Sequence, residues 1–282
     1  MKKVLVTGAN GQLAQCIDLH SKTINEVEFI LAPSSSLDIT RQAEVDSFFD
    51  KHKVHYCINT AAFTNVELAE TQQEKAFKVN ALGAKHLAEA CEKHNATLIH
   101  VSTDYVFDGN NKGEYLETDL TNPINVYGVS KQKGEEYVRA ICSKHFIIRT
   151  SWLYSQFGHN FYKTIKKKIA QGSTLRITTA QIGTPTNAND LTEYVLFLIK
   201  NNIQQYGTYH FSNLGRCTWF DFAKAIANGL GRSKEVDLLV SNAYQTKAKR
   251  PMNSVLSKRK ALKMYPDILS WQDSLTHLIE TT

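Results

Sequence analysis

Short apolar runs alternate with amphipathic segments along the first half of the chain. The apolar runs begin near residues 3, 28, 55, 97 and 145, and a helical spacing of apolar residues follows them. Continuous apolar runs of this length are typical of strands that are buried on both faces of a parallel sheet. The repeated order of strand and helix therefore predicts an α/β fold with a doubly wound parallel sheet and right-handed crossovers.

The first of these strands leads into a glycine turn. Residues 3–7 are followed by Gly8-Ala-Asn-Gly-Gln-Leu-Ala14, and a helical pattern extends from Gln12 to about His20. This order is typical of dinucleotide binding, because glycines let the backbone approach a pyrophosphate and the amides of the helix N-terminus face its charge. The spacing G-x-x-G-x-x-A is a variant of the usual fingerprint. The candidate cofactor contacts here are Gly8, Asn10, Gly11, Gln12 and Leu13.

The ends of the second and third strands supply further candidate cofactor contacts. No acidic residue ends the second strand, where an enzyme strict for NAD often has one. The serines at 34–36 can bind a 2′-phosphate instead, which slightly favours NADPH over NADH. The third strand, residues 55–59, ends in small residues against which a cofactor can lie. The candidates there are Ala62, Phe63 and Thr64.

Two helices follow these strands. The first is predicted to begin at residues 37–40 and to reach about Lys53, with Thr40 as its N-cap. Asp38 is either an ordinary helix-start acid or, with Ile39, a contact for an adenine ring. The second helix covers about 71–94 and contains Asn80. A mid-helix asparagine is usually solvated, but one that faces the sheet can order a neighbouring helix.

Tyr127 and Lys131 stand four residues apart, so they share one face of a predicted helix that runs to about residue 143. An ammonium group beside a phenol favours the phenolate, and such a pair can exchange a proton with a substrate oxygen. The spacing alone is also common on helix surfaces. Its position after four strands of a nucleotide-binding sheet favours catalysis, and Thr103 at the end of the fourth strand can hydrogen bond the same oxygen.

The alternation is less regular after residue 151. Short strands or turns are predicted near residues 175, 184 and 209, with helices after Gly158 and near 190–200 and 219–230. We expect residues 1–151 to form a dinucleotide-binding Rossmann domain. Residues 152–282 are expected to form mainly a smaller α+β substrate-binding lobe, with some segments returning to the Rossmann sheet. No linker rich in Pro, Gly or Ser separates the two, which predicts a close interface.

Composition narrows the class of protein. The chain has 282 residues, of which 42% are hydrophobic and 21% charged, as in soluble globular proteins. It contains no apolar run long enough for a membrane helix, and its N-terminal run is too short for a signal peptide. Five scattered cysteines without a C-x-x-C pair, and ten histidines without ligand spacing, predict neither a disulfide framework nor a metal site. We expect a cytoplasmic protein.

The net charge of +6 includes a basic segment near the C-terminus, where seven basic and no acidic residues lie between residues 241 and 263. This segment is either a solvated basic surface or a clamp for a phosphorylated substrate. Nucleic-acid binding is not expected, because no aromatic residues interleave these charges for stacking.

Segments spread over nearly the whole chain carry a resemblance to a known family. They are Val6–Leu13, Ser102–Gly109, Asn125–Lys131, Arg149–Trp152, Asn160-Phe161, Gln181–Thr186, Gly207–His210, Thr218-Trp219 and Lys249–Pro251. With these segments the chain resembles the extended short-chain dehydrogenase/reductases and, more narrowly, the dTDP-4-dehydrorhamnose reductases. Its departures from that pattern are Ala14 for a common glycine, Phe63 for Tyr or His, and Glu67 for Asp.

The resemblance implies reduction of the C4 ketone of a dTDP-linked 4-keto-6-deoxy sugar with NADPH or NADH, in dTDP-rhamnose biosynthesis. Tyr127 would donate the proton and Thr103 would stabilise the oxygen. Lys131 would lower the pKa of the phenol and contact the nicotinamide ribose. The implied substrate contacts are Thr103, Asp104, Trp152, Asn160 and, at the diphosphate, Arg250. The resemblance permits a monomer or a homodimer; some such reductases pair through an interface metal, and this chain shows no readable magnesium site.

Two other functions stay open at this point. One is a different nucleotide-sugar reaction of the same superfamily, such as epimerisation. Dehydration is disfavoured because Thr103-Asp104 is not followed by a glutamate. The other is a non-catalytic role like that of the regulatory subunit of methionine adenosyltransferase. The presence of Thr103, Tyr127 and Lys131 together argues against a pure binding module.

Overall fold

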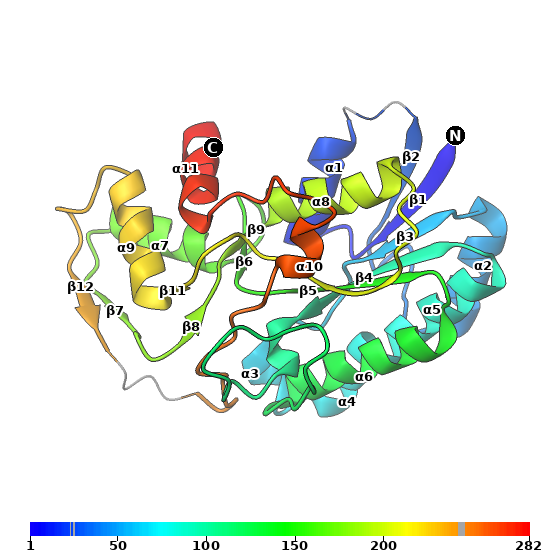
Figure 1. The fold of residues 1–282 in the computed structure, drawn as a ribbon, viewed down its shortest axis with the longest axis horizontal. Helices are drawn as coiled ribbons and strands as arrows, with labels where there is room; N and C mark the ends of the chain where they lie inside the picture. Colours follow the sequence, from blue (N-terminus) through cyan, green and yellow to red (C-terminus); the bar gives the residue numbers. More distant parts are fainter. Residues whose placement is uncertain (23, 25, 242–245) are drawn as a thin grey trace.

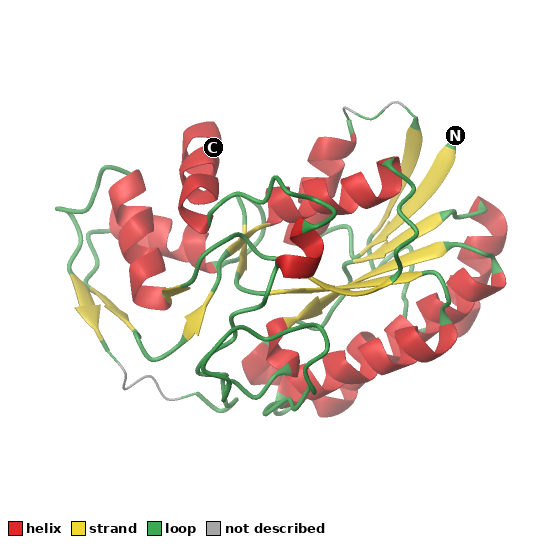
Figure 2. Cartoon of the chain, in the orientation of Figure 1, coloured by secondary structure: helices red, strands yellow, loops and turns green. Residues whose placement is uncertain are grey.

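The computed structural model describes residues 1–22, 24, 26–241 and 246–282. Its centre is a parallel six-stranded sheet in the order β2-β1-β3-β4-β5-β10 (Figures 1 and 2). The strands are β1 (Lys2–Thr7), β2 (Val27–Ala32), β3 (Tyr56–Asn59), β4 (Thr97–Thr103), β5 (His145–Thr150) and β10 (Gly207–His210). The predicted α/β class with a doubly wound parallel sheet is confirmed.

Helices cover both faces of this sheet because each presents one apolar face to it. On one face, α1 (Gln12–Ser21) and α8 (Ala188–Lys200) share a buried apolar cluster with β1, β3 and β5. On the other face, α2 (Gln42–His52), α5 (Gly83–Lys93) and α6 (Val126–Ile141) form a second cluster with the same strands and β4. Figure 1 shows these two helical layers on either side of the strands.

The strand order fixes where a ligand can bind. The chain passes from β1 to β2 on one side and then crosses to β3 on the other, and ligands of open α/β sheets bind at such a reversal, outside the carboxyl ends of the strands. The register places Thr7 beside Asn59, and Thr103 beside Thr150. The polar segments that follow β1, β3, β4 and β5 therefore meet at one edge.

The second half of the chain contributes to the sheet and to a separate layer. α8, β10 and α10 (Arg259–Leu262) lie against the sheet. A third apolar cluster joins α7 (Phe161–Ala170), α9 (Trp219–Gly229) and α11 (Trp271–Thr281). The short ladders beside them pair β7 (Leu175–Ile177) with β12 (Leu238–Val240), β8 (Ile182–Gly183) with β11 (Cys217–Thr218), and β6 (Leu153–Tyr154) with β9 (Thr186–Asn187).

Some local predictions differ from the structure. Thr40 is not the cap of α2, which begins at Gln42 after Arg41, because both the amide and the hydroxyl of Thr40 donate to Asp38 Oδ1 in a turn. The stretch at 71–94 is built from α4 (Gln73–Phe77), a π-helical turn at Lys78–Leu82, and α5. Short helices α3 (Val66–Ala69) and the 3₁₀ turn Asp104–Val106 were not predicted.

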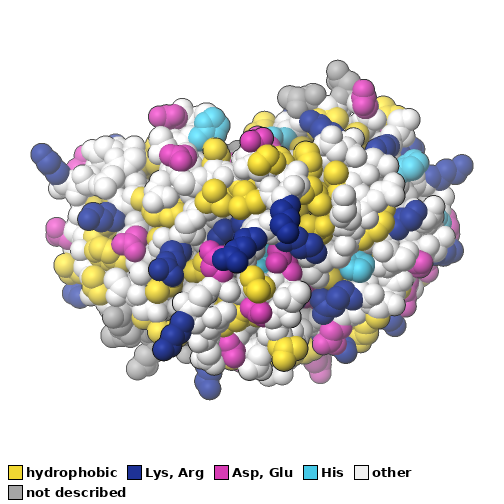
Figure 3. Space-filling model, viewed as in Figure 1, with side chains coloured by type: hydrophobic (Ala, Val, Ile, Leu, Met, Phe, Trp, Pro, Cys, Tyr) yellow, Lys and Arg dark blue, Asp and Glu magenta, His cyan; other side chains and the backbone are white. Residues whose placement is uncertain are grey.

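Three of the basic residues between 246 and 263 are paired, buried or hydrogen-bonded. Arg250 pairs with Glu67, Lys258 is buried, and Lys260 donates to the carbonyl oxygen of Thr208. Residues 242–245 of this segment lie outside the described residues. Basic and acidic side chains are interspersed over the face seen in Figure 3. No helix in the described part of the chain is long and apolar enough to cross a membrane.

Candidate active site

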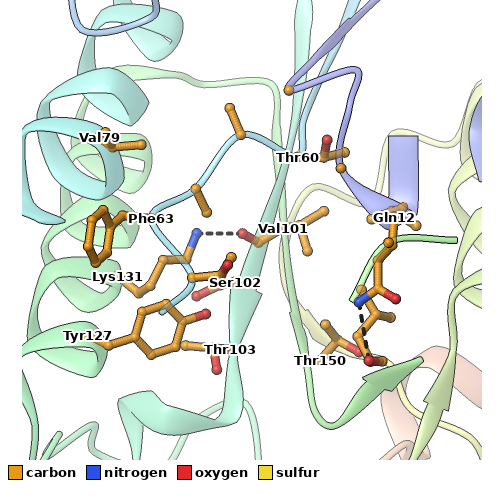
Figure 4. Close-up of a pocket in the computed structure, with 18 of the residues that line it drawn as sticks. Gln12, Thr60, Phe63, Val79, Val101, Ser102, Thr103, Tyr127, Lys131 and Thr150 are labelled. Atoms are coloured by element: carbon orange, nitrogen blue, oxygen red, sulfur yellow. Dashed lines mark hydrogen bonds between the residues drawn. The ribbon is translucent and has the colours of Figure 1, made fainter. Parts of the chain in front are cut away.

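A cavity of about 840 Å³ opens at the carboxyl edge of the sheet. Its walls come from the glycine turn, the segments after β2, β3 and β4, the start of α6 and the segment after β5 (Figure 4). Every predicted cofactor contact lines it: Gly8, Asn10, Gly11, Gln12, Leu13, Asp38, Ile39, Ala62, Phe63, Thr64, Tyr127 and Lys131. The structure also brings Thr103, Asp104 and Trp152 into this wall.

The backbone of the glycine turn lies so close to the segment after β3 that a side chain would not fit. Gly8 has φ of +67°, and a Cβ there would lie 2.8 Å from the Cα atom of Ala61. Gly11 precedes α1 without a side-chain cap, so the first amides of that helix have no side-chain acceptor. Gln12 Nε2 donates to the carbonyl oxygen of Leu153, which joins this turn to the second half of the chain (Figure 4).

One face of α6 carries Tyr127, Lys131 and Glu135, each four residues from the next. Asn125 caps the helix by accepting from the Gly128 amide at 2.8 Å. Lys131 is only 2% exposed, and its Nζ donates to the carbonyl oxygen of Val101 at 2.7 Å (Figure 4). Burial lowers the pKa of Lys131 to about 8, opposed by the Glu135 carboxylate.

The expected effect of Lys131 on the phenol is not seen. Burial raises the pKa of Tyr127 above its ordinary value, although a hydrogen bond with Thr103 opposes this shift. The Lys131 ammonium donates to the carbonyl oxygen of Val101 and makes no hydrogen bond to the phenol. The phenol is therefore protonated at neutral pH, the state that a proton donor requires.

A buried polar chain reaches Lys131 from the glycine turn. Thr7 Oγ1 donates to Asn59 Oδ1 at 2.7 Å, the Asn59 amide lies 3.0 Å from His100 Nδ1, and His100 Nε2 lies 3.4 Å from Lys131 Nζ. Burial holds the pKa of His100 well below its ordinary range, so the ring is neutral and its Nε2 can accept from the Lys131 ammonium. The sequence offered no local signal for this contact across three strands.

Glu135 forms a buried ion pair beneath the site. Its carboxylate accepts from Arg149 Nε and Nη2 at 2.9 and 2.8 Å, from Ser102 Oγ at 2.6 Å and from Arg139 at 2.9 Å. Burial alone would raise the pKa of Glu135, but Arg149 and the other donors lower it to about 2. The sequence could have predicted this burial, because Glu135 stands four residues after Lys131 and therefore lies on the same face of the helix.

Asn80 faces inward from the π-helical turn. Its Oδ1 accepts from the Phe63 amide at 2.8 Å, and its Nδ2 donates to Ser130 Oγ at 2.9 Å. It therefore holds the segment after β3 against α6, which is the second of the two roles considered for a mid-helix asparagine. π-Helical turns are frequent at functional sites.

Two predicted substrate contacts do not line the cavity. Asn160 is buried as the cap of α7, and its Nδ2 donates to Gln12 Oε1 and to the carbonyl oxygens of Ser155 and Phe157. Arg250 Nη2 donates to Glu67 Oε1 at 3.0 Å. Sequence patterns did not reveal these contacts, which use the Asn160 amide and Arg250 Nη2 but leave Arg250 Nε without a partner.

Asp104 and Trp152 do line the cavity. Burial raises the pKa of Asp104 to about 6, although hydrogen bonds from Ser254 and Thr103 oppose this shift. Other lining residues that the sequence did not single out include Thr60, Lys75, Val79, Thr150 and His159. No group of three metal-ligating side chains occurs among the residues that the structure describes.

Known proteins share this sequence and fold along their whole length. The family model described as "RmlD substrate binding domain" matches residues 1–282. A dTDP-4-dehydrorhamnose reductase from Aggregatibacter actinomycetemcomitans is 36% identical, over 99% of this chain and 98% of its own.

Two solved structures are also similar. A dTDP-4-dehydrorhamnose reductase from Clostridium acetobutylicum has a TM-score of 0.93 at 39% identity, covering 99% of each chain. Another from Bacillus anthracis, in complex with NADP, has a TM-score of 0.93 at 35% identity, covering 100% of both chains. With this cavity and these full-length similarities, the chain belongs to the dTDP-4-dehydrorhamnose reductase family.

Proposed function

We propose that this chain reduces the C4 ketone of dTDP-4-dehydro-6-deoxy-L-mannose (dTDP-4-dehydrorhamnose) with NAD(P)H and forms dTDP-L-rhamnose. The observation that carries the proposal is that Tyr127, Thr103 and Lys131 line the same cavity as the glycine turn. The names of the full-length relatives support the same reaction and the same sugar nucleotide.

The residues fit a nicotinamide dinucleotide. Gly8 lets the turn lie close against Ala61, and the uncapped amides of α1 can receive a pyrophosphate. Bound there, the nicotinamide supplies the hydride that C4 receives. We propose a slight preference for NADPH, because β2 ends without an acid and Ser34 lines the cavity.

The side chains then protonate and stabilise the O4 oxygen, on which negative charge develops. Tyr127 donates its phenolic proton to this oxygen, and its raised pKa keeps that proton available at neutral pH. Thr103 Oγ1 donates to Asp104 Oδ1 at 3.0 Å and can turn to O4, a stabilisation of about 3 kcal/mol in comparable sites. The buried ammonium of Lys131 stabilises the phenolate left behind.

Lys131 also has a hydrogen left for the cofactor. Two of its three N–H bonds are accounted for by the Val101 carbonyl oxygen at 2.7 Å and His100 Nε2 at 3.4 Å. We assign the third to a nicotinamide ribose hydroxyl. We assign the hexose to the space between Tyr127 and Trp152, with Asp104 as a further contact. We keep Arg250 as a contact for the diphosphate, since its Nε has no partner while its Nη2 pairs with Glu67.

The test is an assay of the purified chain with dTDP-4-dehydrorhamnose, run in parallel with NADPH and NADH. We expect reduced cofactor to be consumed in proportion to the sugar, with dTDP-rhamnose as the product and a lower KM for NADPH. Turnover of the sugar without net oxidation of cofactor would identify an epimerase instead. Absence of any turnover by a folded, cofactor-binding chain would favour a regulatory subunit.

A further inference from the structure

The backbone of Trp152 adopts a conformation that needs support. Its φ is +47°, in the left-handed region that a residue with a Cβ rarely occupies. Such conformations persist only where the surrounding structure fixes them, and they concentrate at functional sites. The side chain lines the cavity and is only half-buried, so burial alone does not hold it.

Trp219 supplies one part of that support. Its ring stacks on the Trp152 ring with centroids 3.6 Å apart and planes at 9°. Trp219 is itself fixed, because it is the first residue of α9, after a Thr218 cap that forms a capping box with Asp221. Its indole nitrogen donates to Gln181 Oε1 at 3.0 Å.

The segment around β8 supplies the second part. A Cβ on Gly183 would lie 2.5 Å from the Trp152 ring, so only glycine leaves space for the indole. β8 pairs antiparallel with β11 and thereby places Gly183 beside Cys217, two residues before Trp219. The flanking backbone is also tied down, since Ser151 Oγ donates to the carbonyl oxygen of Thr184 at 2.7 Å.

These contacts give a structural role to residues 181–186 and 218–219, two segments that take no part in the reaction itself. We propose that Trp219 is a positioning residue which, together with Gly183, holds the Trp152 indole as a rigid wall for the hexose of the sugar nucleotide. The proposal rests on the proposed function, in which the hexose lies between Tyr127 and Trp152. A rigid wall lowers the ordering cost of binding and fixes the ketone relative to Tyr127.

The chain offers matched variants for a test. Trp219→Leu removes the ring but keeps an apolar side chain, and Trp219→Phe keeps an aromatic face. Trp271→Phe is the control, because this third tryptophan is buried against Phe222 and does not line the cavity. We expect KM for the sugar nucleotide to rise about tenfold in Trp219→Leu, with partial recovery in Trp219→Phe. NADPH affinity should stay unchanged in all three variants, because neither Trp219 nor Trp271 lines the cavity.

A spectroscopic measurement tests the stack without any turnover. Two indoles this close couple their electronic transitions, and a twist between their transition moments within the stacked planes splits the far-ultraviolet circular dichroism band. We expect such a split band in the wild-type chain. The split should vanish in both Trp219 variants and persist in Trp271→Phe. A split band that persists unchanged in both Trp219 variants would overturn the stack of Trp219 on Trp152.

The kinetic and spectroscopic results also distinguish a failure of the positioning role from a failure of the proposed function. An unchanged KM for the sugar in a folded Trp219→Leu chain overturns the positioning role. A wild-type chain that shows the split band and binds NADPH but does not reduce the sugar contradicts the proposed function instead, and the positioning role falls with it.

Discussion

Replacing Gly8 by alanine tests the glycine turn most sharply, because the chain contains a matched control. Gly8 has φ of +67° and Gly172 has φ of +63°, so alanine at either position meets the same unfavourable backbone conformation. A Cβ on Gly172 has no atom within 4 Å, whereas a Cβ on Gly8 lies 2.8 Å from Ala61 Cα and 2.9 Å from its nitrogen. The difference between the two variants therefore isolates the close approach of the backbone.

The structure sets the expected magnitudes. Left-handed backbone costs an alanine about 1–2 kcal/mol, which is the whole expected loss for Gly172→Ala. Gly8→Ala adds an overpacking cost of about 1–3 kcal/mol, since backbone atoms of Ala61 cannot simply rotate away. We therefore expect Gly8→Ala to lose about 2–5 kcal/mol of the free energy of unfolding. NADPH affinity should fall at least about tenfold, because the added methyl group forces apart Gly8 and Ala61, which both belong to the cavity wall.

Urea unfolding gives the first quantity, and titration with NADPH, followed by the quenching of protein fluorescence, gives the second. Gly172→Ala should bind NADPH like the wild type. Equal stability of the two variants, or unchanged NADPH affinity in Gly8→Ala, would refute the assignment of this turn to pyrophosphate binding.

Two further predictions concern the charges below the site. Burial lowers the pKa of Lys131 to about 8, so its ammonium is present below that pH and lost above it. We therefore expect kcat/KM for the sugar to fall as the pH rises through about 8. A flat profile up to about pH 10 would show that the charge is not needed. Glu135→Gln should cost about 3–5 kcal/mol in the free energy of unfolding by breaking the buried pair with Arg149, whereas Glu136→Gln, on the exposed side of the same helix, should cost little. Because the pKa of Glu135 is lowered from 4.5 to about 2, the wild type should lose this contribution as pH falls between those values, and an equally steep acid unfolding of Glu135→Gln would contradict it.

The parts of the site that the sequence predicted are those with local patterns. The glycine turn, the strand that precedes it and the spacing of Tyr127 and Lys131 lie within short segments, so their periodicity was enough to place them. Thr40 was mispredicted as a cap because its side chain has a nearer acceptor in Asp38, a choice that propensity alone does not decide.

The features that were missed depend on contacts between distant segments. The pair of Glu135 and Arg149 joins α6 to β5. Arg250 pairs with Glu67, which lies 183 residues earlier in the sequence. The direction of the Tyr127 shift was also mispredicted, because the neighbouring lysine was visible in the sequence while the desolvation of the phenol was not. Burial depends on the tertiary structure, and here it raises the pKa of Tyr127.

Tyr127→Phe tests whether Tyr127 donates the proton to the sugar oxygen. Tyr137→Phe is the matched control, because it makes the same change on α6 outside the cavity. Turnover of dTDP-4-dehydrorhamnose should fall about 10²–10⁴-fold in Tyr127→Phe, with NADPH affinity retained, and should be unchanged in Tyr137→Phe. Reduction by Tyr127→Phe at close to the wild-type rate would contradict the account.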